Sequence, residues 1–244
     1  MLCDWNPWGV LPVMSDDAAF LANFNGVTRL FPLPGLVFFP TVVQGLHIFE
    51  QRYRQMFEDA IADDQLVTLV LLKEGTDQPY LDDPEIETTA CLGRITHYER
   101  LDDGKLNLRL KGISRVRLTE EVPTDKLYRL ARAEPLADVV PADFQLLLAL
   151  RTRLAEAVLP RFEPSGPAFH HLTELFAGDT PLGSLSDMLT FALPLETDLK
   201  QLLLSEPHVH ARAELLTQAL LLTTPAAAGG GNGKRKFPPD FSAN

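Results

Sequence analysis

The stretch LFPLPGLVFFPTVVQGLHIFEQRYRQMFEDAI, residues 30–61, joins a proline-rich part, a strand pattern and a helix pattern in direct succession. Pro32, Pro34 and Pro40 fix φ and remove backbone donors, which is typical of an extended path at the edge of a sheet. An order of stiff extended chain, strand and helix indicates a mixed fold, and the rest of the chain is interpreted from this starting point.

Two phenylalanines follow one another in the proline-rich part. Adjacent side chains on an extended chain point to opposite sides. Of Phe38 and Phe39, we therefore expect one to remain near the surface and to contribute to an apolar patch. We expect Phe31, Leu33 and Val37 to enter the core.

The second and third parts predict a strand and an amphipathic helix. Branched and apolar residues in TVVQGLHIFE favour one strand, or two strands interrupted at Gly45. Apolar residues then recur with helical spacing, at Tyr53, Met56, Phe57, Ala60 and Ile61. The next apolar run, LVTLVLL at residues 66–72, is typical of a strand that is covered on both faces.

A hairpin is predicted around LDDG at residues 101–104. Asp103 and Gly104 have the chemistry of a tight turn, and after it Leu106, Leu108 and Leu110 alternate with polar residues. Gly112 interrupts this alternation, as a bulge or bend would. Another strand is expected in KLYRLARAE, residues 126–134, and several antiparallel strands this close together suggest a barrel.

The period becomes helical after Pro141. Residues 142–160 form one apolar stripe that stops at Pro160, and shorter helical patterns follow up to about residue 222. This half of the chain predicts a small helical bundle.

The composition is that of an ordinary globular protein, with 45% hydrophobic and 23% charged residues and a formal net charge of −11. Cys3 and Cys91 form no disulfide framework, and the amino terminus lacks a secretion signal, so we expect a cytoplasmic protein. Met1 and Met14 are both candidate start sites, because Ser15 or Asp16 can cap a helix that begins directly after Met14.

Two ordered groups of residues carry a family pattern. The first group contains Phe31, Pro32, Leu33, Phe39, Pro40, Leu46, Ile48, Phe49, Glu50, Arg52 and Tyr53. The second group contains Gly93, Arg94, Ile95, Gly104, Leu108, Gly112, Arg115, Val116, Arg117 and Leu118. In this pattern, and in the helices near its end, the chain resembles the Lon protease N-terminal domain family over most of residues 30–222.

This resemblance implies an α+β fold, in which a PUA-like β-barrel with one amphipathic helix is followed by a small C-terminal helical bundle. The expected division is an N-terminal extension at residues 1–26, the barrel subdomain at 27–138, the bundle subdomain at 139–223 and a disordered tail at 224–244.

The resemblance also implies a stand-alone substrate-recognition domain without the ATPase and peptidase domains of the protease. We expect a non-catalytic domain without a cofactor. It would bind exposed apolar segments of unfolded or damaged proteins, in a groove between barrel and bundle, or act as an adaptor to a protease or chaperone. The candidate polypeptide-binding residues are Phe38, Phe39, His47, Phe49, Arg52 and Tyr53.

RNA binding through the PUA-like barrel is the alternative function. Arg109, Lys111, Arg115 and Arg117 share one face if the strand alternates regularly. The formal net charge of −11 opposes binding to phosphate, and a solvated sheet face explains the same residues. A small-molecule sensor is a third interpretation, and the chain lacks the cysteines of the zinc-bearing relatives.

Catalytic and metal motifs are incomplete. The sequence AGGGNGKR near the end departs from the phosphate-binding loop pattern, and no G-x-S-x-G occurs. His170 and Glu174 are four residues apart on a predicted helix, but a metal site would need a third ligand such as His208 or His210. We therefore expect no metal.

Overall fold

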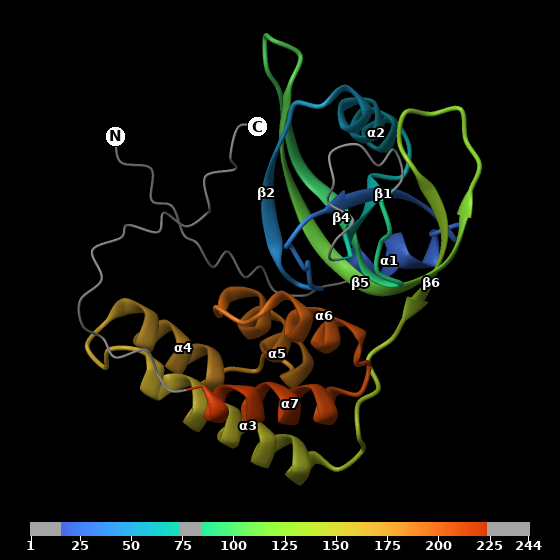
Figure 1. Ribbon diagram of the computed structural model, residues 1–244. Helices are drawn as coiled ribbons and strands as arrows, with labels where there is room; N and C mark the ends of the chain where they lie inside the picture. Colours follow the sequence, from blue (N-terminus) through green and yellow to red (C-terminus); the bar gives the residue numbers. More distant parts are fainter. Residues whose placement is uncertain (1–15, 74–83, 224–244) are drawn as a thin grey trace.

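Figure 1 shows the computed structural model, which describes residues 16–73 and 84–223. The tail expected at 224–244, both candidate start sites and most of the acidic loop before Glu85 lie outside these residues. The described strands are β1 (Val27–Leu33), β2 (Val43–Ile48), β3 (Leu66–Leu71), β4 (Thr89–Arg100), β5 (Leu106–Val122) and β6 (Leu130–Leu136). The described α-helices are α1 (Asp16–Ala22), α2 (Gln51–Ala62), α3 (Phe144–Val158), α4 (Pro167–Ala177), α5 (Leu182–Ala192), α6 (Thr197–Ser205) and α7 (Val209–Leu222).

The predicted mixed α+β organisation is confirmed. Strands dominate the first half, and helices α3 to α7 gather beside the sheet in the second half (Figure 1). The predicted strand at residues 66–72 is β3, and every residue of β3 is buried. The predicted turn also forms, since Gly104 has a φ of +77°, which glycine adopts without strain.

Strand β5 is the centre of the sheet. It pairs with β4 from Leu106 to Arg117, with β2 through its first half and with β6 through its second half. Because β6 also pairs with β1, β1 with β3 and β3 with β4, the pairings of these five strands return to their starting point. Strand β2 is attached to the outside of this ring.

A bulge in β5 changes the direction of its side chains. Ser114 pairs with Leu92 and Gly112 with Gly93, so Ile113 is an extra residue between the two pairs. An extra residue shifts the alternation by one position, and side chains before and after it face opposite sides of the sheet. The interruption expected at Gly112 is therefore present, one residue further along the chain.

Apolar residues form separate clusters on the two faces of the sheet. One cluster contains Leu30, Leu66, Val70, Ala90, Leu92, Val116, Ala131 and Ala133, and Phe20 and Leu21 of α1 pack against it. The other lies beneath α2 and extends to Leu204 of α6. Helix α2 contributes Met56, Phe57 and Ala60 to this second cluster, which confirms the predicted apolar stripe.

The helical half has a core of its own. Helix α3 begins where the Asp143 carboxylate accepts hydrogen bonds from the amides of Gln145 and Leu146, and it ends before a short 3₁₀ turn that contains Pro160. Helix α3 packs against α7, and apolar residues of α3, α4, α5, α6 and α7 form one buried cluster.

Charged side chains are buried where the sheet meets the helices. The guanidinium of Arg115 on β5 donates to Asp187 of α5, to the Leu204 carbonyl oxygen at 2.9 Å and to Asp138 at 3.2 Å. Arg212 of α7 lies 2.7 Å from Asp138 and 3.1 Å from Asp187. We name Arg115, Asp138, Asp187 and Arg212 the junction network. Its two arginines have almost no exposed surface.

Helix α2 is fixed to the sheet by polar contacts. The Tyr128 hydroxyl, in the segment before β6, donates to the Asp59 carboxylate of α2 at 2.7 Å. Arg29 on β1 forms ion pairs with Asp63 and Asp64, directly after α2. Burial, together with the neighbouring Asp59 carboxylate, raises the pKa of Tyr128 to about 12.

Arg115→Met should lower the free energy of unfolding by roughly 3–5 kcal/mol, because it leaves Asp187 buried without its main partner. Arg117→Met is the matched control, since Arg117 lies on the same strand and is exposed. The control should change the free energy of unfolding by less than about 0.5 kcal/mol. Urea unfolding of the three proteins measures both values, and equal losses for the two variants would contradict this account of the junction network.

Tyr128→Phe should remove part of the alkaline unfolding of the protein. The folded state holds the phenol proton with a pKa of about 12, whereas an unfolded chain releases it near pH 10. This contribution is therefore complete below about pH 10 and disappears as the pH rises towards 12. Between these pH values the native protein should lose about 1–2 kcal/mol more stability than Tyr128→Phe. Urea unfolding at a series of pH values checks this, and parallel curves would contradict it.

Candidate functional site

The two adjacent phenylalanines are both in the core. Phe38 is 1% exposed and Phe39 is 0% exposed, so the expectation that one of them stays near the surface is wrong. The segment between β1 and β2 does not continue as a strand, and the helices cover it. The ring of Phe38 packs edge-on against Phe191 of α5 with 6.5 Å between ring centroids. Phe38 therefore joins the sheet to the helices.

The course of this segment is held against β5. The Thr41 amide donates to the Gly112 carbonyl oxygen and the Gly112 amide donates to the Val42 carbonyl oxygen, each at 2.9 Å. Thr41 has a φ of +67°, which a β-branched residue rarely adopts. A Cβ atom on Gly112 would lie 2.1 Å from the Phe39 carbonyl oxygen. Glycine at position 112 thus permits the close approach that buries Phe39.

Three of the remaining candidates lie at the surface where β2 ends and α2 begins. His47 forms a 2.8 Å hydrogen bond with Asn107 of β5, and its ring is 6.3 Å from that of Phe49. Phe49 is 49% exposed, although it is a large apolar side chain. Arg52 donates hydrogen bonds to the Glu50 carboxylate at 2.8 and 3.0 Å. We call His47, Phe49 and Arg52 the β2–α2 patch.

Tyr53 lies at the border of the core behind the β2–α2 patch. Its ring meets that of Phe31 edge-on at 4.6 Å and lies 5.0 Å from the Arg52 guanidinium. Burial raises the pKa of the Tyr53 phenol. The Tyr53 side chain therefore packs behind the β2–α2 patch, and its ring contacts the Arg52 guanidinium.

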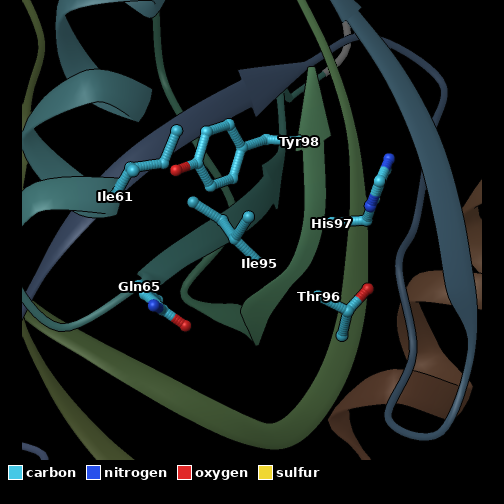
Figure 2. A pocket seen from close by; sticks show the side chains of 6 residues that line it. All are labelled: Ile61, Gln65, Ile95, Thr96, His97 and Tyr98. Carbon is cyan, nitrogen blue, oxygen red and sulfur yellow. The ribbon is translucent and has the colours of Figure 1, made fainter.

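A cavity of about 210 Å³ lies between the end of α2 and β4. Figure 2 shows Tyr98 and Ile95 on the side of β4 that faces Ile61 of α2, while His97 points to the opposite side. Gln65, Thr96 and His97 complete its lining. A cavity of this size, with both apolar and polar side chains in its wall, can accept one side chain of a ligand.

A second bulge creates this cavity. Ile95 pairs with Leu110 and His97 with Arg109, so Thr96 is an extra residue in β4. The shift turns Tyr98, which is 42% exposed, to the same face as Ile95. Tyr98 is not recognisable as a cavity residue from the sequence, because regular alternation assigns it to the opposite face from Ile95 and no residue type in the sequence marks the bulge.

The basic residues of β5 do not form one surface. Arg115 is buried in the junction network, and the bulge at Ile113 separates Arg115 and Arg117 from Arg109 and Lys111. The Lys111 ammonium is 2.6 Å from the Asp17 carboxylate of α1. The expected common face of these four residues is therefore wrong, and the observation that favoured RNA is lost.

The described residues contain no group of three or more histidine, cysteine or acidic side chains placed to hold a metal ion. His208 instead forms a 2.8 Å hydrogen bond with Glu206. Cys91 is fully buried, and burial raises the pKa of its thiol, which removes it as a nucleophile at neutral pH. No helix in the described part of the chain is long and apolar enough to cross a membrane.

Packing fills part of the boundary between sheet and helices, where the sequence predicts a groove. The junction network and the contact between Phe38 and Phe191 lie at this boundary. The β2–α2 patch and the cavity beside α2 are open to solvent, and both belong to the strand half of the chain.

Comparison with known proteins gives the same assignment as the motifs. The family model of the ATP-dependent protease La (LON) substrate-binding domain matches residues 27–221. The chain belongs to the Lon substrate-binding domain family. The matched residues include β1 to β6 and α2 to α6 in full, together with nearly all of α7.

Two curated relatives show how much of a whole protease is represented. The chain is 28% identical to the Lon protease of Heliobacterium modesticaldum over 193 residues and 26% identical to that of Anaeromyxobacter dehalogenans over 204 residues. These alignments cover 78% and 81% of this chain but 23% of each relative. The chain thus spans about a quarter of the length of the proteases that it matches.

Two solved structures have the same fold. The Lon N-terminal domain protein of Xanthomonas campestris superposes with a TM-score of 0.55 at 23% identity, covering 79% of this chain and 97% of its own. The N-terminal domain of the Mycobacterium avium complex Lon protease gives a TM-score of 0.62 at 14% identity, covering 80% and 98%. At these identities the likeness concerns the fold.

Gly112→Ala should destabilise the protein by about 3 kcal/mol or more, because the new methyl group overlaps the Phe39 carbonyl oxygen and a buried backbone contact must move. Gly45→Ala is the control, since a Cβ atom there meets nothing within 4 Å. Thermal and urea unfolding should show a large loss for the first variant and a small change for the second. Similar stability of the two variants would mean that Phe39 does not depend on Gly112.

Proposed function

We propose that this chain binds exposed apolar segments of unfolded or damaged polypeptides and performs no catalysis itself. It would act as a recognition domain for, or an adaptor to, a protease or chaperone in the bacterial cytoplasm. The membership in a substrate-binding family supports the substrate class. The observation that carries the proposal is the half-exposed Phe49 in the β2–α2 patch.

The chemistry of the patch suits a ligand without a fixed sequence. Exposed aromatic rings offer a large apolar contact area at little cost in side-chain entropy. Arg52, already neutralised by Glu50, adds a polar rim that does not demand an acidic partner. The cavity lined by Tyr98 and Ile61 would accept an additional apolar side chain of the same polypeptide.

The architecture of the family supports a division of labour within the chain. We propose that the closed ring of strands is the PUA-like barrel implied by the motifs, with its subdomain at residues 27–138 and the helical subdomain at 139–223. In this arrangement the strand half would provide the binding surface, and the helices would hold it in one orientation through the junction network.

Phe49→Ser should weaken binding of an unfolded client by about 1–2 kcal/mol, or roughly 5- to 30-fold, because it removes an aromatic contact. A reduced and carboxymethylated protein that cannot refold is a suitable client, and its native form is the negative control. Fluorescence anisotropy measures the Kd, and the stability of the variant should equal that of the native chain.

Phe144→Ser is the matched control, since Phe144 on α3 is 64% exposed but lies in the helical half. It should leave the Kd unchanged. A larger loss for Phe144→Ser than for Phe49→Ser would move the site to α3. No binding of the unfolded client by the native chain at several hundred micromolar would overturn the proposed function.

A further inference from the structure

Strand β2 has an open edge. It pairs with β5 from Val43 to Ile48, and in the described part of the chain no strand pairs with its other side. Figure 1 shows β2 at the outside of the sheet. The other five strands each have neighbours on both sides over at least part of their length. The open edge of β2 thus runs along the whole strand.

The pairing register shows which backbone groups face outward. The Gly112 amide bonds the Val42 carbonyl oxygen, and antiparallel strands alternate between bonded and non-bonded pairs. Gln44, Leu46 and Ile48 therefore direct their backbone groups towards β5. Val43, Gly45 and His47, which lie between them, direct their N–H and C=O groups to the open side. In agreement, the Gly45 carbonyl oxygen accepts a hydrogen bond from the Gln44 side chain at 2.8 Å.

This edge lacks the usual protection against another strand. Natural sheets guard such edges with charged residues, proline or a cover. The β2 sequence VQGLHI contains neither a formal charge nor proline, and a Cβ atom on Gly45 would meet nothing within 4 Å. By contrast, the end of β4 that extends beyond β3 carries Glu99 and Arg100.

The surroundings of the edge select one occupant. Val43, Gly45, His47 and Phe49 occupy alternate positions, and Val43 and Phe49 among them are exposed apolar side chains, so an added strand would meet exposed apolar surface on this face. The whole chain has a formal net charge of −11, whereas β2 is uncharged, which favours an uncharged partner over an acidic one. We propose that β2 takes up an extended, uncharged, apolar stretch of a client polypeptide as an additional strand. This inference rests on the proposed function.

Binding through the main chain has a specific consequence. Hydrogen bonds to Val43, Gly45 and His47 depend on the backbone of the client and not on its side chains, whereas contacts with Phe49 depend on side chains. The edge would therefore give affinity to many different apolar sequences, provided that each can be extended over about six residues.

A set of N-methylated peptides separates the two contributions. The probe is a nine-residue peptide of alternating valine and threonine with one phenylalanine, in three forms: unmethylated, methylated at every second amide, and methylated at every amide. The second form still presents one complete edge, so its Kd should stay within about twofold of the parent. The third form should bind at least tenfold more weakly. Equal binding of all three forms would overturn the inference.

Gly45→Pro tests the same main-chain hydrogen bonding by changing the protein instead of the peptide. It removes the outward N–H of residue 45 and leaves the bonds of Gln44 and Leu46 to β5 in place, as proline on an edge strand can. Gly45→Pro should weaken binding of the unmethylated peptide at least tenfold. Gly45→Ala keeps the N–H and should bind the peptide with the same Kd as the native chain. If Gly45→Pro does not fold, the Kd values of the three peptide forms with the native protein test the inference instead.

Hydrogen exchange gives a residue-level readout. The bound peptide should slow exchange at the amides of Val43, Gly45 and His47 and leave Gln44 and Leu46 as they were. Protection of the same amides by a rise in protein concentration alone, with dimers in sedimentation velocity, would make a second copy the occupant and overturn the proposal.

The two proposals fail in different ways. If the unfolded client binds but methylation and Gly45→Pro have no effect, the edge is not used and the proposed function stands. If neither the client nor the peptide binds, both proposals are wrong.

Discussion

The ion pair between Arg115 and Asp187 is the contact on which the arrangement of this molecule depends. Both side chains are almost entirely removed from water, and a buried charge is very costly without a partner of opposite sign. Asp138 and Arg212 complete the junction network, so each charge has at least one opposite neighbour. Apolar packing alone could slide, whereas this network is satisfied in one relative position of sheet and helices.

The junction network in turn depends on the irregularity of β5. The extra residue Ile113 turns Arg115 towards the helices, while Arg109 and Lys111 remain on the opposite face. The same strand serves β2, β4 and β6, and it can do so because its two halves face different partners. The extra residue Ile113 thereby directs the Arg115 guanidinium into the interior and leaves β2 outside the ring of five strands.

The two proposed recognition surfaces both belong to the strand half of the chain. The β2–α2 patch offers side chains, in particular the ring of Phe49, and we propose that it selects apolar surface of any sequence. The edge of β2 offers backbone groups, and we propose that it selects an extended conformation. An unfolded polypeptide has both properties, whereas a folded protein has buried its apolar residues and paired its strands. The two surfaces meet at the end of β2, so one ligand could use both.

The sequence by itself determined the elements and the family. Helical spacing in residues 53–61, the turn at Asp103 and Gly104, and the continuous apolar run of β3 are local patterns, and local patterns follow from neighbouring residues. The candidates His47, Phe49 and Arg52 lie together because they are close to one another in the chain, and Phe49 and Arg52 belong to the family motif. The tertiary structure decided the rest. Regular alternation mispredicted Phe38, Phe39 and Arg115, because the exposure of each is set by a bulge or by helices distant in sequence. Local residues determine which side chains alternate, but the partner strand determines where alternation breaks and which face becomes covered.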